Sequence, residues 1–508
     1  MSLSRRTINS LLAGVPLVGS LPLAITEAHA QSKRDSLVLG MILEPTPGLD
    51  PTMASAAAIG EIVHYNIFEG LTKIAMDGAV TPLLADNWYH TPDGKTYTFT
   101  LKKGIKFSDG AAFDASAVKF SFDRARAAGS TNKAKKAVFD NISSVVVQDA
   151  HTVILVLNNA DALMPFRLGE NTAVILHPGS AASAATKPVG TGPYKLDNWA
   201  KGSAITLVAS ANHRDAAKLK IKRVTFRFIN DPAAQVAALL AGDIDGMPRF
   251  GALQSTKQFQ GDKRFTVEVG STSGKGIVAI NNKKAPLNDV RVRRAIAAAI
   301  DRAAVIESSA DGFGVPIGSY YVPGAPGYVD TTALNPYDPA KARALLKEAA
   351  RDLGFTLPLQ LTMKLPPTPY ARQGGEVVAA LLAQVGIKAK IENVEWAQWL
   401  SGVYGQKAYD LTLISHVEPL DFGNFARPNY YWGYDSAEFK ALWSRIQATL
   451  DGAERNKLMA EAQRLVARDA VSAYLYQPTW LTVADARLRG LWKDMPLMVN
   501  DLAVLRWE

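Results

Sequence analysis

Strand patterns and capped helices alternate along this chain, and this alternation limits the fold more than any other feature of the sequence. The segment Lys95–Leu101 (K-T-Y-T-F-T-L) places an apolar side chain at every second position, which is the pattern of a half-buried strand. Asp114 then precedes a segment with apolar residues at helical spacing, as expected of a helix cap. Because such signals repeat along the chain, the sequence predicts an α/β fold of mixed sheets with helices on both faces.

Further helix starts have the same form. Asp231–Pro232 and Asp338–Pro339 each combine a capping residue with a proline at the first helical position. Between them, the pattern that begins at Asp289 predicts one long helix whose arginines lie mostly on a solvated face. A chain of 508 residues exceeds what a single hydrophobic core usually serves, so we expect two or more lobes.

Residues 1–30 have the organisation of an export signal. A short basic start with Arg5–Arg6 leads into an apolar run, and Ala28–Ala30 (A-H-A) provides a small-x-small cleavage site. The paired arginines resemble a twin-arginine signal, and an ordinary secretory signal is the alternative. No later segment reaches the length of a membrane span, so we expect an exported protein cleaved near Ala30.

The chain contains no cysteine, which restricts both its stabilisation and its chemistry. Disulfides, thiolate metal sites, cysteine nucleophiles and a lipid-modified cysteine after the signal are all excluded. The net charge of +9 is spread along the chain, without a basic block or a nucleic-acid-binding motif. We therefore expect a periplasmic protein that binds no nucleic acid.

Enzyme motifs are absent from the sequence. It contains no H-x-x-H or H-E-x-x-H metal pairing, no G-x-S-x-G nucleophile turn, no phosphate-binding loop and no dinucleotide fingerprint. We predict a protein without catalysis, resident metal or cofactor. A secreted hydrolase that uses His416 and Asp421 is the alternative from a different class.

Polar and aromatic residues crowd into the stretch Ser415–Ser436. The apolar segment Asp410–Ser415 predicts a strand that leads into it, and loops at strand ends beside a cleft carry ligand groups in α/β proteins. His416 opens the loop, and Glu418 and Asp421 follow as acidic residues spaced by three. A carboxylate held there suits an ammonium group, because a charge-assisted hydrogen bond strengthens once water is excluded.

Six phrases of the sequence, taken together, resemble a known family. They are Asn66–Thr72 (N-I-F-E-G-L-T), Thr81–Trp88 (T-P-L-L-A-D-N-W), Asp93–Gly110, Pro188–Leu196 (P-V-G-T-G-P-Y-K-L), Ala238–Asp245 (A-L-L-A-G-D-I-D) and Asn288–Arg302. From about Leu37 to the C-terminus the chain is similar to the solute-binding proteins of the peptide/opine/nickel class of ABC importers, bacterial extracellular solute-binding protein family 5. The fourth phrase also has a plain structural interpretation, since Gly190 and Gly192 suit a close approach of two backbones.

The resemblance implies a type II periplasmic binding protein fold of the peptide-binding class, with two lobes and an extra subdomain. By similarity, lobe I combines residues 31–74, 187–275 and 473–508, the extra subdomain is 75–186, and lobe II is 276–472. The chain is expected to cross between the lobes near Gly276–Asn282 and Ala473–Pro478. In this family the lobes close on a ligand and deliver it to a membrane permease.

Two charged residues of the site are also implied by the resemblance. Asp421 matches, through Asn424–Phe425, an aspartate that receives the free amino terminus of the ligand in peptide-binding relatives. The denser D-x-D pattern of those relatives is not kept, which puts a strictly peptide ligand in doubt. Glu418 either shares this role or caps the loop. Arg372 matches an arginine that grips the ligand carboxylate in dipeptide-type relatives, and a solvated arginine at a helix start is the alternative.

Aromatic side chains complete the predicted pocket, because they offer rigid surface with few polar tips. Trp396 and Trp432 are the preferred ligand neighbours, and Tyr431 is a further candidate. His416 is expected to hydrogen-bond the ligand or contact a metal chelate, since one histidine without partners makes direct metal coordination unfavourable.

The function implied by these residues is that of a periplasmic solute receptor. We expect a monomer that captures a small zwitterionic ligand, either a di- or oligopeptide or an amino-acid conjugate such as glutathione or an opine, and passes it to an integral membrane permease. A receptor for nickel or another metal chelate is the alternative within the family.

Overall fold

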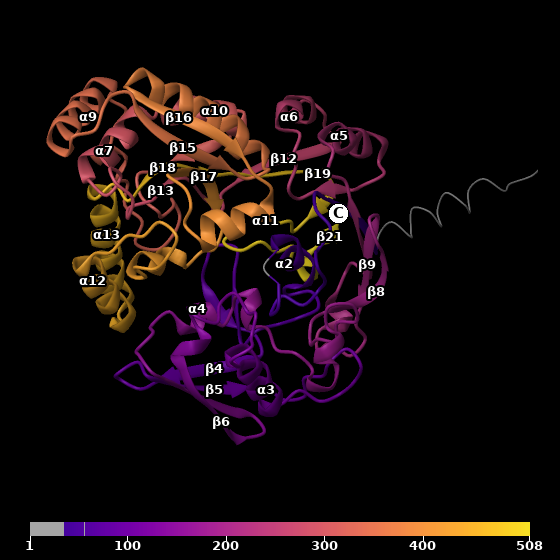
Figure 1. The fold of residues 1–508 in the computed structure, drawn as a ribbon. Coiled ribbons are helices and arrows are strands. Elements are labelled where there is room, and N and C mark those ends of the chain that lie inside the picture. The colour runs from indigo at the N-terminus through magenta and orange to yellow at the C-terminus, as the bar shows by residue number, and fades with distance from the viewer. Residues whose placement is uncertain (1–34, 55) are drawn as a thin grey trace, which may run out of the picture.

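The computed structural model describes residues 35–54 and 56–508 (Figure 1). The predicted export signal at 1–30 lies outside these residues. Within the described part, three larger sheets organise the molecule, and two two-stranded sheets accompany them. We name the parts of the molecule after the larger sheets.

Lobe I contains a seven-stranded mixed sheet in the order β12-β19-β11-β1-β10-β9-β8. Its strands are β1 (Ser36–Met41), β8 (Tyr194–Ala200), β9 (Ala204–Ala209), β10 (Arg223–Phe228), β11 (Gly246–Met247), β12 (Phe265–Gly270) and β19 (Trp480–Asp485). Helices α2 (Ala57–Val63), α5 (Pro232–Ala241) and α6 (Thr256–Gln260) accompany it. Parallel pairing of β1 with β10 sets Leu39 opposite Phe226, and both side chains lie in the core of this lobe.

The subdomain is built on a four-stranded antiparallel sheet in the order β4-β5-β7-β6. Its elements are β4 (Ala85–His90), β5 (Thr96–Leu101), α3 (Ala115–Arg126), β6 (Ile142–Asp149), β7 (Thr152–Leu157) and α4 (Met164–Arg167). The predicted strand at Lys95–Leu101 is confirmed as β5. The small sheet of β2 (Thr72–Ile74) and β3 (Val80–Pro82) leads into it, and a second small sheet of β20 (Leu488–Arg489) and β21 (Arg506–Trp507) lies near the C-terminus.

Lobe II contains a six-stranded mixed sheet in the order β14-β18-β13-β17-β15-β16. Its strands are β13 (Lys275–Ile280), β14 (Gly314–Pro316), β15 (Leu359–Leu365), β16 (Ile387–Asn393), β17 (Leu411–His416) and β18 (Ser472–Pro478). Its helices are α7 (Val290–Ala299), α8 (Arg302–Ala310), α9 (Pro339–Leu353), α10 (Pro369–Gln384), α11 (Trp396–Gln398), the π-helical segment η7 (Trp399–Gly405), the 3-10 helix η8 (Asp421–Ala426), α12 (Ala437–Ala448) and α13 (Gly452–Arg468).

The two faces of the lobe II sheet bury different side chains. Val278 and Ile280 of β13 join an aliphatic core with residues of α7, α8, α9 and α10. Ile277 and Ala279, which alternate with them, join a second core that we call the aromatic cluster. Its aromatic members are Tyr320, Tyr321, Trp399, Tyr409, Phe422, Phe425, Tyr430, Tyr431, Trp432, Tyr434, Phe439, Trp443 and Tyr474. Helices therefore cover both faces of this sheet, as the alternating sequence pattern predicts.

The chain passes between lobe I and lobe II at two neighbouring points. Residues 271–274 connect β12 with β13, and Thr479 connects β18 with β19. The two crossings are bonded to each other, because the Thr272 hydroxyl donates to the Pro478 carbonyl at 2.6 Å and the Gln477 amide donates to the Thr272 carbonyl at 2.6 Å. All of β18 pairs within lobe II, so the second crossing lies at the end of the segment Ala473–Pro478.

The predicted caps are confirmed. Asp114, Asp231 and Asp338 each accept a hydrogen bond from a backbone N–H in the first turn of α3, α5 and α9. Gly242 and Gly354 end α5 and α9 in the left-handed conformation that glycine adopts without strain.

The prediction of one long helix from Asp289 is wrong, because the segment is divided into α7 and α8. Ile300 and Asp301 are extended, and the Asp301 carboxylate accepts from the N–H groups of Ala303 and Ala304 to start the second helix. The prediction of solvated arginines also fails for Arg293, which is buried and donates to the carbonyl oxygens of Leu287 and Asn288.

The close approach predicted at Gly190 and Gly192 is confirmed. A Cβ added to Gly190 would lie 2.0 Å from the Ile67 carbonyl oxygen, and one added to Gly192 would lie 2.3 Å from that of Asn66. The segment before β8 therefore packs directly on the backbone after α2.

No helix in the part of the chain that the structure describes is both long and apolar enough to cross a membrane.

Candidate ligand-binding site

The loop that follows β17 carries the polar residues of the candidate site. β17 pairs with β13 in antiparallel register, with His416 opposite Lys275, so these two side chains leave the same face of the sheet. The loop then enters η8, where Phe422 and Phe425 are buried in the aromatic cluster. This anchoring holds Asp421, the first residue of η8, against the end of β13.

The Asp421 carboxylate already has a cationic partner inside the protein. The Lys275 ammonium group lies 2.7 Å from Asp421 Oδ1, and the Tyr320 hydroxyl donates to Asp421 Oδ2 at 2.6 Å. Lys275 also donates to the carbonyl oxygen of Glu418. The side chains of Lys275 and Asp421 are only 3% and 10% exposed, so this ion pair is largely withdrawn from water.

His416 lies beside this pair as a neutral base. Burial lowers the pKa of His416, although the Asp421 and Glu418 carboxylates act in the opposite direction. Its Nε2 atom is 2.9 Å from the Tyr431 hydroxyl, and its Nδ1 atom is 3.7 Å from Asp421 Oδ2. The imidazole therefore bridges the aromatic cluster and the carboxylate.

Glu418 faces the subdomain across the space between the two parts. Its Oε1 atom lies 3.7 Å from Nζ of Lys133, and its side chain is 42% exposed. Partial burial alone would raise the pKa of Glu418, but nearby positive charges, that of Lys133 foremost, outweigh it and lower the pKa to about 2. Glu418 is therefore ionised at neutral pH.

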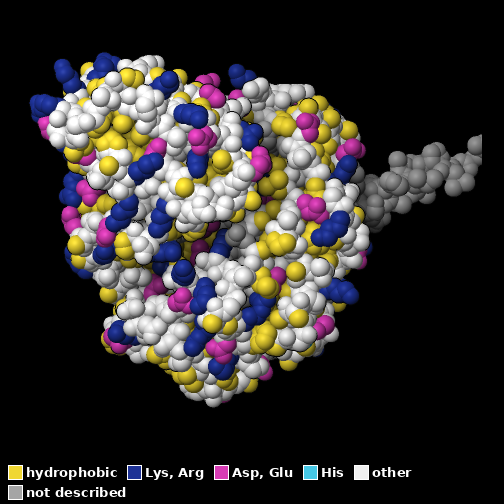
Figure 2. Space-filling model, in the orientation of Figure 1, with side chains coloured by type: hydrophobic (Ala, Val, Ile, Leu, Met, Phe, Trp, Pro, Cys, Tyr) yellow, Lys and Arg dark blue, Asp and Glu magenta, His cyan; other side chains and the backbone are white. Residues whose placement is uncertain are grey.

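Glu170, which belongs to the subdomain, is a second carboxylate at this junction, after Glu418 of lobe II. Burial raises the pKa of Glu170 to about 7, and the charges of Glu418 and Asp421 add to this rise, against the lowering effect of Arg167 and Lys133. Elsewhere along the same interface, the Ala162 N–H donates to the Gln447 carbonyl of α12 at 2.8 Å. The loop after β17 thus lies where lobe II meets the subdomain, and Figure 2 shows a hollow between the upper and lower halves of the molecule with charged side chains at its rim.

The predicted aromatic residues fall into two groups. Trp396 is 44% exposed and stacks on the buried Trp399 with ring centroids 5.3 Å apart. Tyr404 of η7 is also partly exposed, so this segment presents an aromatic surface. By contrast, Tyr431 is 1% exposed and Trp432 is 0% exposed.

The prediction that Trp432 and Tyr431 contact the ligand therefore needs correction. Trp432 packs against Phe425 and Tyr430, and Tyr431 contacts His416 through its hydroxyl group and through its ring, with ring centroids 5.9 Å apart. Both side chains support the loop from behind, because they have almost no surface left to offer a ligand.

Arg372 lies in the first turns of α10, apart from the loop. Its side chain is 45% exposed, and its nearest acidic partner is Glu395, at 3.8 Å. The start of α10 is nonetheless close to the end of β17, since the Ser415 N–H donates to the Tyr370 hydroxyl at 3.0 Å. The structure brings Arg372 near the same strand end without joining it to Asp421.

Sequence reasoning missed the residues that pair with the predicted carboxylates. These residues lie at four well-separated positions of the chain and share no motif with the loop; they are Lys133, Glu170, Lys275 and Tyr320. Lys275 alone carried a signal: it begins the apolar segment K-G-I-V-A-I of a central strand, and a lysine on a buried face requires a partner.

The spacing of three side chains in the loop would admit a metal ion. His416, Glu418 and Asp421 each offer a ligand atom, and these atoms lie within 4.8 Å of one another. The Lys275 ammonium, however, is in contact with Asp421 and repels a further cation there. The donor set therefore does not fit a resident metal.

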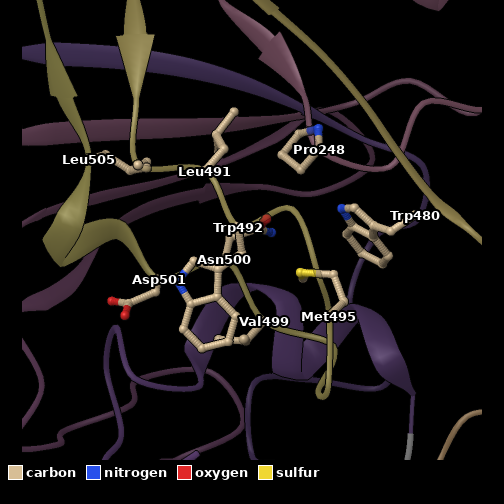
Figure 3. A pocket seen from close by; sticks show the side chains of 10 residues that line it. Pro248, Trp480, Leu491, Trp492, Met495, Val499, Asn500, Asp501 and Leu505 are labelled. Carbon is tan, nitrogen blue, oxygen red and sulfur yellow. The ribbon is translucent and has the colours of Figure 1, made fainter. Parts of the chain in front are cut away.

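Two other hollows of the described residues lie outside this loop. The pocket in Figure 3, between Trp480, Met495 and Asn500, has a volume of about 10 Å³, roughly the space for one water molecule. A more open hollow of about 290 Å³ lies on lobe I. Its charged groups are paired with each other, with Glu69 on Arg214 and Lys73 on Asp501.

Comparison with known proteins gives matches over most of the chain. The family model described as "Bacterial extracellular solute-binding proteins, family 5 Middle" matches residues 79–437. Di/tripeptide-binding protein 1 of Pseudomonas aeruginosa (strain UCBPP-PA14) is 27% identical, over 94% of this chain and 97% of that protein. The glutathione-binding protein GsiB of Salmonella choleraesuis (strain SC-B67) is 30% identical, over 87% of this chain and 89% of that protein.

The fold is also similar to a solved structure. The periplasmic binding protein DppA from Helicobacter pylori, in complex with the peptide STSA, has a TM-score of 0.80 at 25% identity, covering 94% of this chain and 100% of that chain. The two-lobed α/β architecture expected from the sequence is therefore confirmed, and the family match includes the loop after β17.

Proposed function

This chain belongs to family 5 of the bacterial extracellular solute-binding proteins, and from that premise we propose that it captures a small amino-acid-derived solute in the periplasm for an ABC importer. The proposed cargo is a di- or oligopeptide, or an amino-acid conjugate such as glutathione or an opine. The observation that carries this proposal is the position of the charged loop after β17, which faces Lys133 and Glu170 across the junction of lobe II and the subdomain.

Lobe closure is the proposed mechanism. The crossings at 271–274 and Thr479 are short and bonded to each other, so they form a hinge about which the lobes turn as units. Lobe II and the subdomain are the two walls of the site. A ligand that contacts both walls stabilises the closed form, because it loses the contacts with one wall in the open form. The closed form then docks on the membrane permease, and we propose that a single copy of the chain does so.

The ligand contacts that we propose come from the exposed side chains of the site. Trp396 offers an aromatic face, Arg372 offers a planar guanidinium group for a carboxylate, and Glu418 offers an ionised oxygen at the junction. His416 contributes through its position between Asp421 and Tyr431.

We also propose that the protein releases its ligand unchanged. The family consists of substrate-binding proteins. Ser415, which precedes His416, leaves the opposite face of β17, because side chains alternate along a strand. It is therefore not placed to act as a nucleophile with that histidine.

Native mass spectrometry of protein purified from its own periplasm tests the proposal. We expect a bound species with the mass of a small peptide or amino-acid conjugate, which is lost when the protein is denatured. Retention of a metal chelate instead would favour the alternative within the family. Turnover of an ester or peptide that is abolished in His416→Ala would overturn the receptor function in favour of a hydrolase.

A further inference from the structure

The end of β13 places a buried lysine at the position where the family resemblance puts a ligand's amino group. Side chains alternate along β13, so Lys275 leaves the sheet on the same face as Ile277 and Ala279. Both of these residues lie in the aromatic cluster, and the Lys275 stem is buried with them. Only the ammonium end reaches a polar environment, at Asp421.

The contacts of that ammonium group are those that a ligand's amino terminus would make. It lies 2.7 Å from Asp421 Oδ1, and it also donates to the Glu418 carbonyl oxygen. The Tyr320 ring lies under it at 4.9 Å, which adds a cation–π contact. A carboxylate oxygen, a backbone carbonyl and an aromatic face together form a complete receptor for an ammonium group.

The second oxygen of Asp421 is also engaged. Tyr320 donates to Oδ2 at 2.6 Å, and His416 Nδ1 lies 3.7 Å from the same atom. With a side chain only 10% exposed, Asp421 has little surface left for a further donor. A second ammonium group would also be repelled by the first across a few ångströms of weakly screened space.

Displacement of Lys275 by a ligand is unfavourable. β13 is a central strand: Lys275 pairs with His416 of β17, and the next residue, Gly276, pairs with both β17 and β18, so the backbone of Lys275 is held in place. An ammonium group pushed out of this position would lie among the apolar side chains of the aromatic cluster without a partner, which is costly.

We propose that Lys275 determines ligand class: its ammonium group takes the place at Asp421 of a ligand's free amino terminus, so the receptor selects amino-acid-derived ligands whose amino nitrogen is acylated or absent. This inference rests on the proposed function, because it presumes that the loop after β17 contacts the ligand. It replaces the interpretation of Asp421 as the direct receptor of a ligand ammonium group.

The test uses one dipeptide library prepared in two forms, with a free amino terminus and with an N-acetyl group. The forms are mixed in equal amounts, incubated with the full chain, and the complexes are counted by native mass spectrometry, in which the acetyl group distinguishes them. We expect the wild-type protein to favour the acetylated form by at least about tenfold, since the free ammonium group would remain buried without a partner.

Lys275→Met supplies the complementary measurement, because it frees Asp421 while keeping the length and apolar character of the stem. We expect the preference to shift by at least about tenfold towards the free amino form, which then provides the missing cation. Lys275→Arg keeps the charge and is expected to keep the acetyl preference. Lys284→Met is the matched control, because Lys284 lies in the loop after β13 and pairs with buried Asp410, which precedes β17.

The outcomes separate this inference from the function on which it rests. If wild-type protein binds the free form as well as or better than the acetylated form, the role of Lys275 is overturned while the receptor function stands. Loss of that binding in Glu418→Gln would then place the ligand ammonium group on Glu418. If neither form binds, the peptide cargo of the proposed function fails and the inference fails with it.

Discussion

At the scale of single residues, Lys275 and Asp421 form the ion pair on which the candidate site depends. Both side chains are largely buried, and each supplies the charge that makes burial of the other tolerable. Removing one partner of a buried pair leaves the other charge uncompensated, and this cost exceeds what the pair itself contributes.

Asp421→Ala is therefore expected to lower the free energy of unfolding by about 3–5 kcal/mol. Urea denaturation followed by tryptophan fluorescence measures this change. Asp435→Ala is the matched control, because Asp435 pairs with Lys283 and Lys440 but its side chain is 43% exposed, and it should cost at most about 1 kcal/mol. Equal effects of the two substitutions would contradict the structural role of Asp421.

Glu170 gives the site a dependence on pH. Its pKa is raised from 4.5 to about 7 in the folded protein, mainly by burial and further by the charges of Glu418 and Asp421. A carboxyl group with a raised folded-state pKa binds protons more tightly in the folded than in the unfolded chain. Its favourable contribution is complete below pH 4.5 and is lost as the pH rises towards about 7.

We expect the contribution of Glu170 to the melting temperature to fall between pH 4.5 and 7 and to stay level above that range. Glu170→Gln stays neutral at every pH, so the difference in melting temperature between this variant and the wild type isolates that contribution. The melting temperature of the variant should rise relative to that of the wild type as the pH increases from 4.5 to 7. A difference that is constant with pH would show that Glu170 titrates normally.

At the scale of secondary-structure elements, the contact between the segment before β8 and the backbone after α2 has no space for a side chain. A Cβ on Gly190 would lie 2.0 Å from the Ile67 carbonyl oxygen, so one of two backbone segments would have to move. Gly190→Ala is expected to destabilise lobe I by about 1–3 kcal/mol or more in denaturant unfolding. Gly129→Ala, where a Cβ meets nothing within 4 Å, is the control and should have little effect.

The elements that the sequence predicted well are those whose signals are local. Asp114, Asp231 and Asp338 cap their helices because the partner N–H groups lie within the next few residues. The break between α7 and α8 was missed because its apolar pattern continues through Ile300, and only the Asp301 cap marks the new start. The phrases that carry the family resemblance predicted the two-lobed architecture as a whole.

The candidate site was predicted only in part because its partners are distant in sequence. His416, Glu418 and Asp421 were identified from their crowding in one loop, whereas Lys275 meets Asp421 only through the pairing of β13 with β17. Exposure could not be predicted either. Trp396 and Trp432 looked equivalent in sequence, yet one is 44% exposed and the other is completely buried.

At the scale of the whole molecule, the contact between α12 and the subdomain offers a way to hold the two walls together. The Ala162 N–H lies 2.8 Å from the Gln447 carbonyl oxygen, so the two residues are directly adjacent across the junction. Backbone atoms bonded in this way bring the Cα atoms to within about 6 Å, which is a separation that a disulfide can span. Because the natural chain has no cysteine, an introduced pair can form only one intramolecular disulfide.

The double variant Ala162→Cys/Gln447→Cys should therefore lock the closed form on oxidation. Ligand loaded before oxidation is expected to be retained, and ligand added afterwards should not enter, until a reductant restores exchange, because release requires the walls to separate. Native mass spectrometry at successive times measures how fast the retained native ligand dissociates. Each single-cysteine variant under the same oxidant is the control and should exchange at the wild-type rate. Exchange that is equally fast in the oxidised and reduced double variant would mean that the lobes do not open at this junction, and that the hinge formed by residues 271–274 and Thr479 serves a different motion.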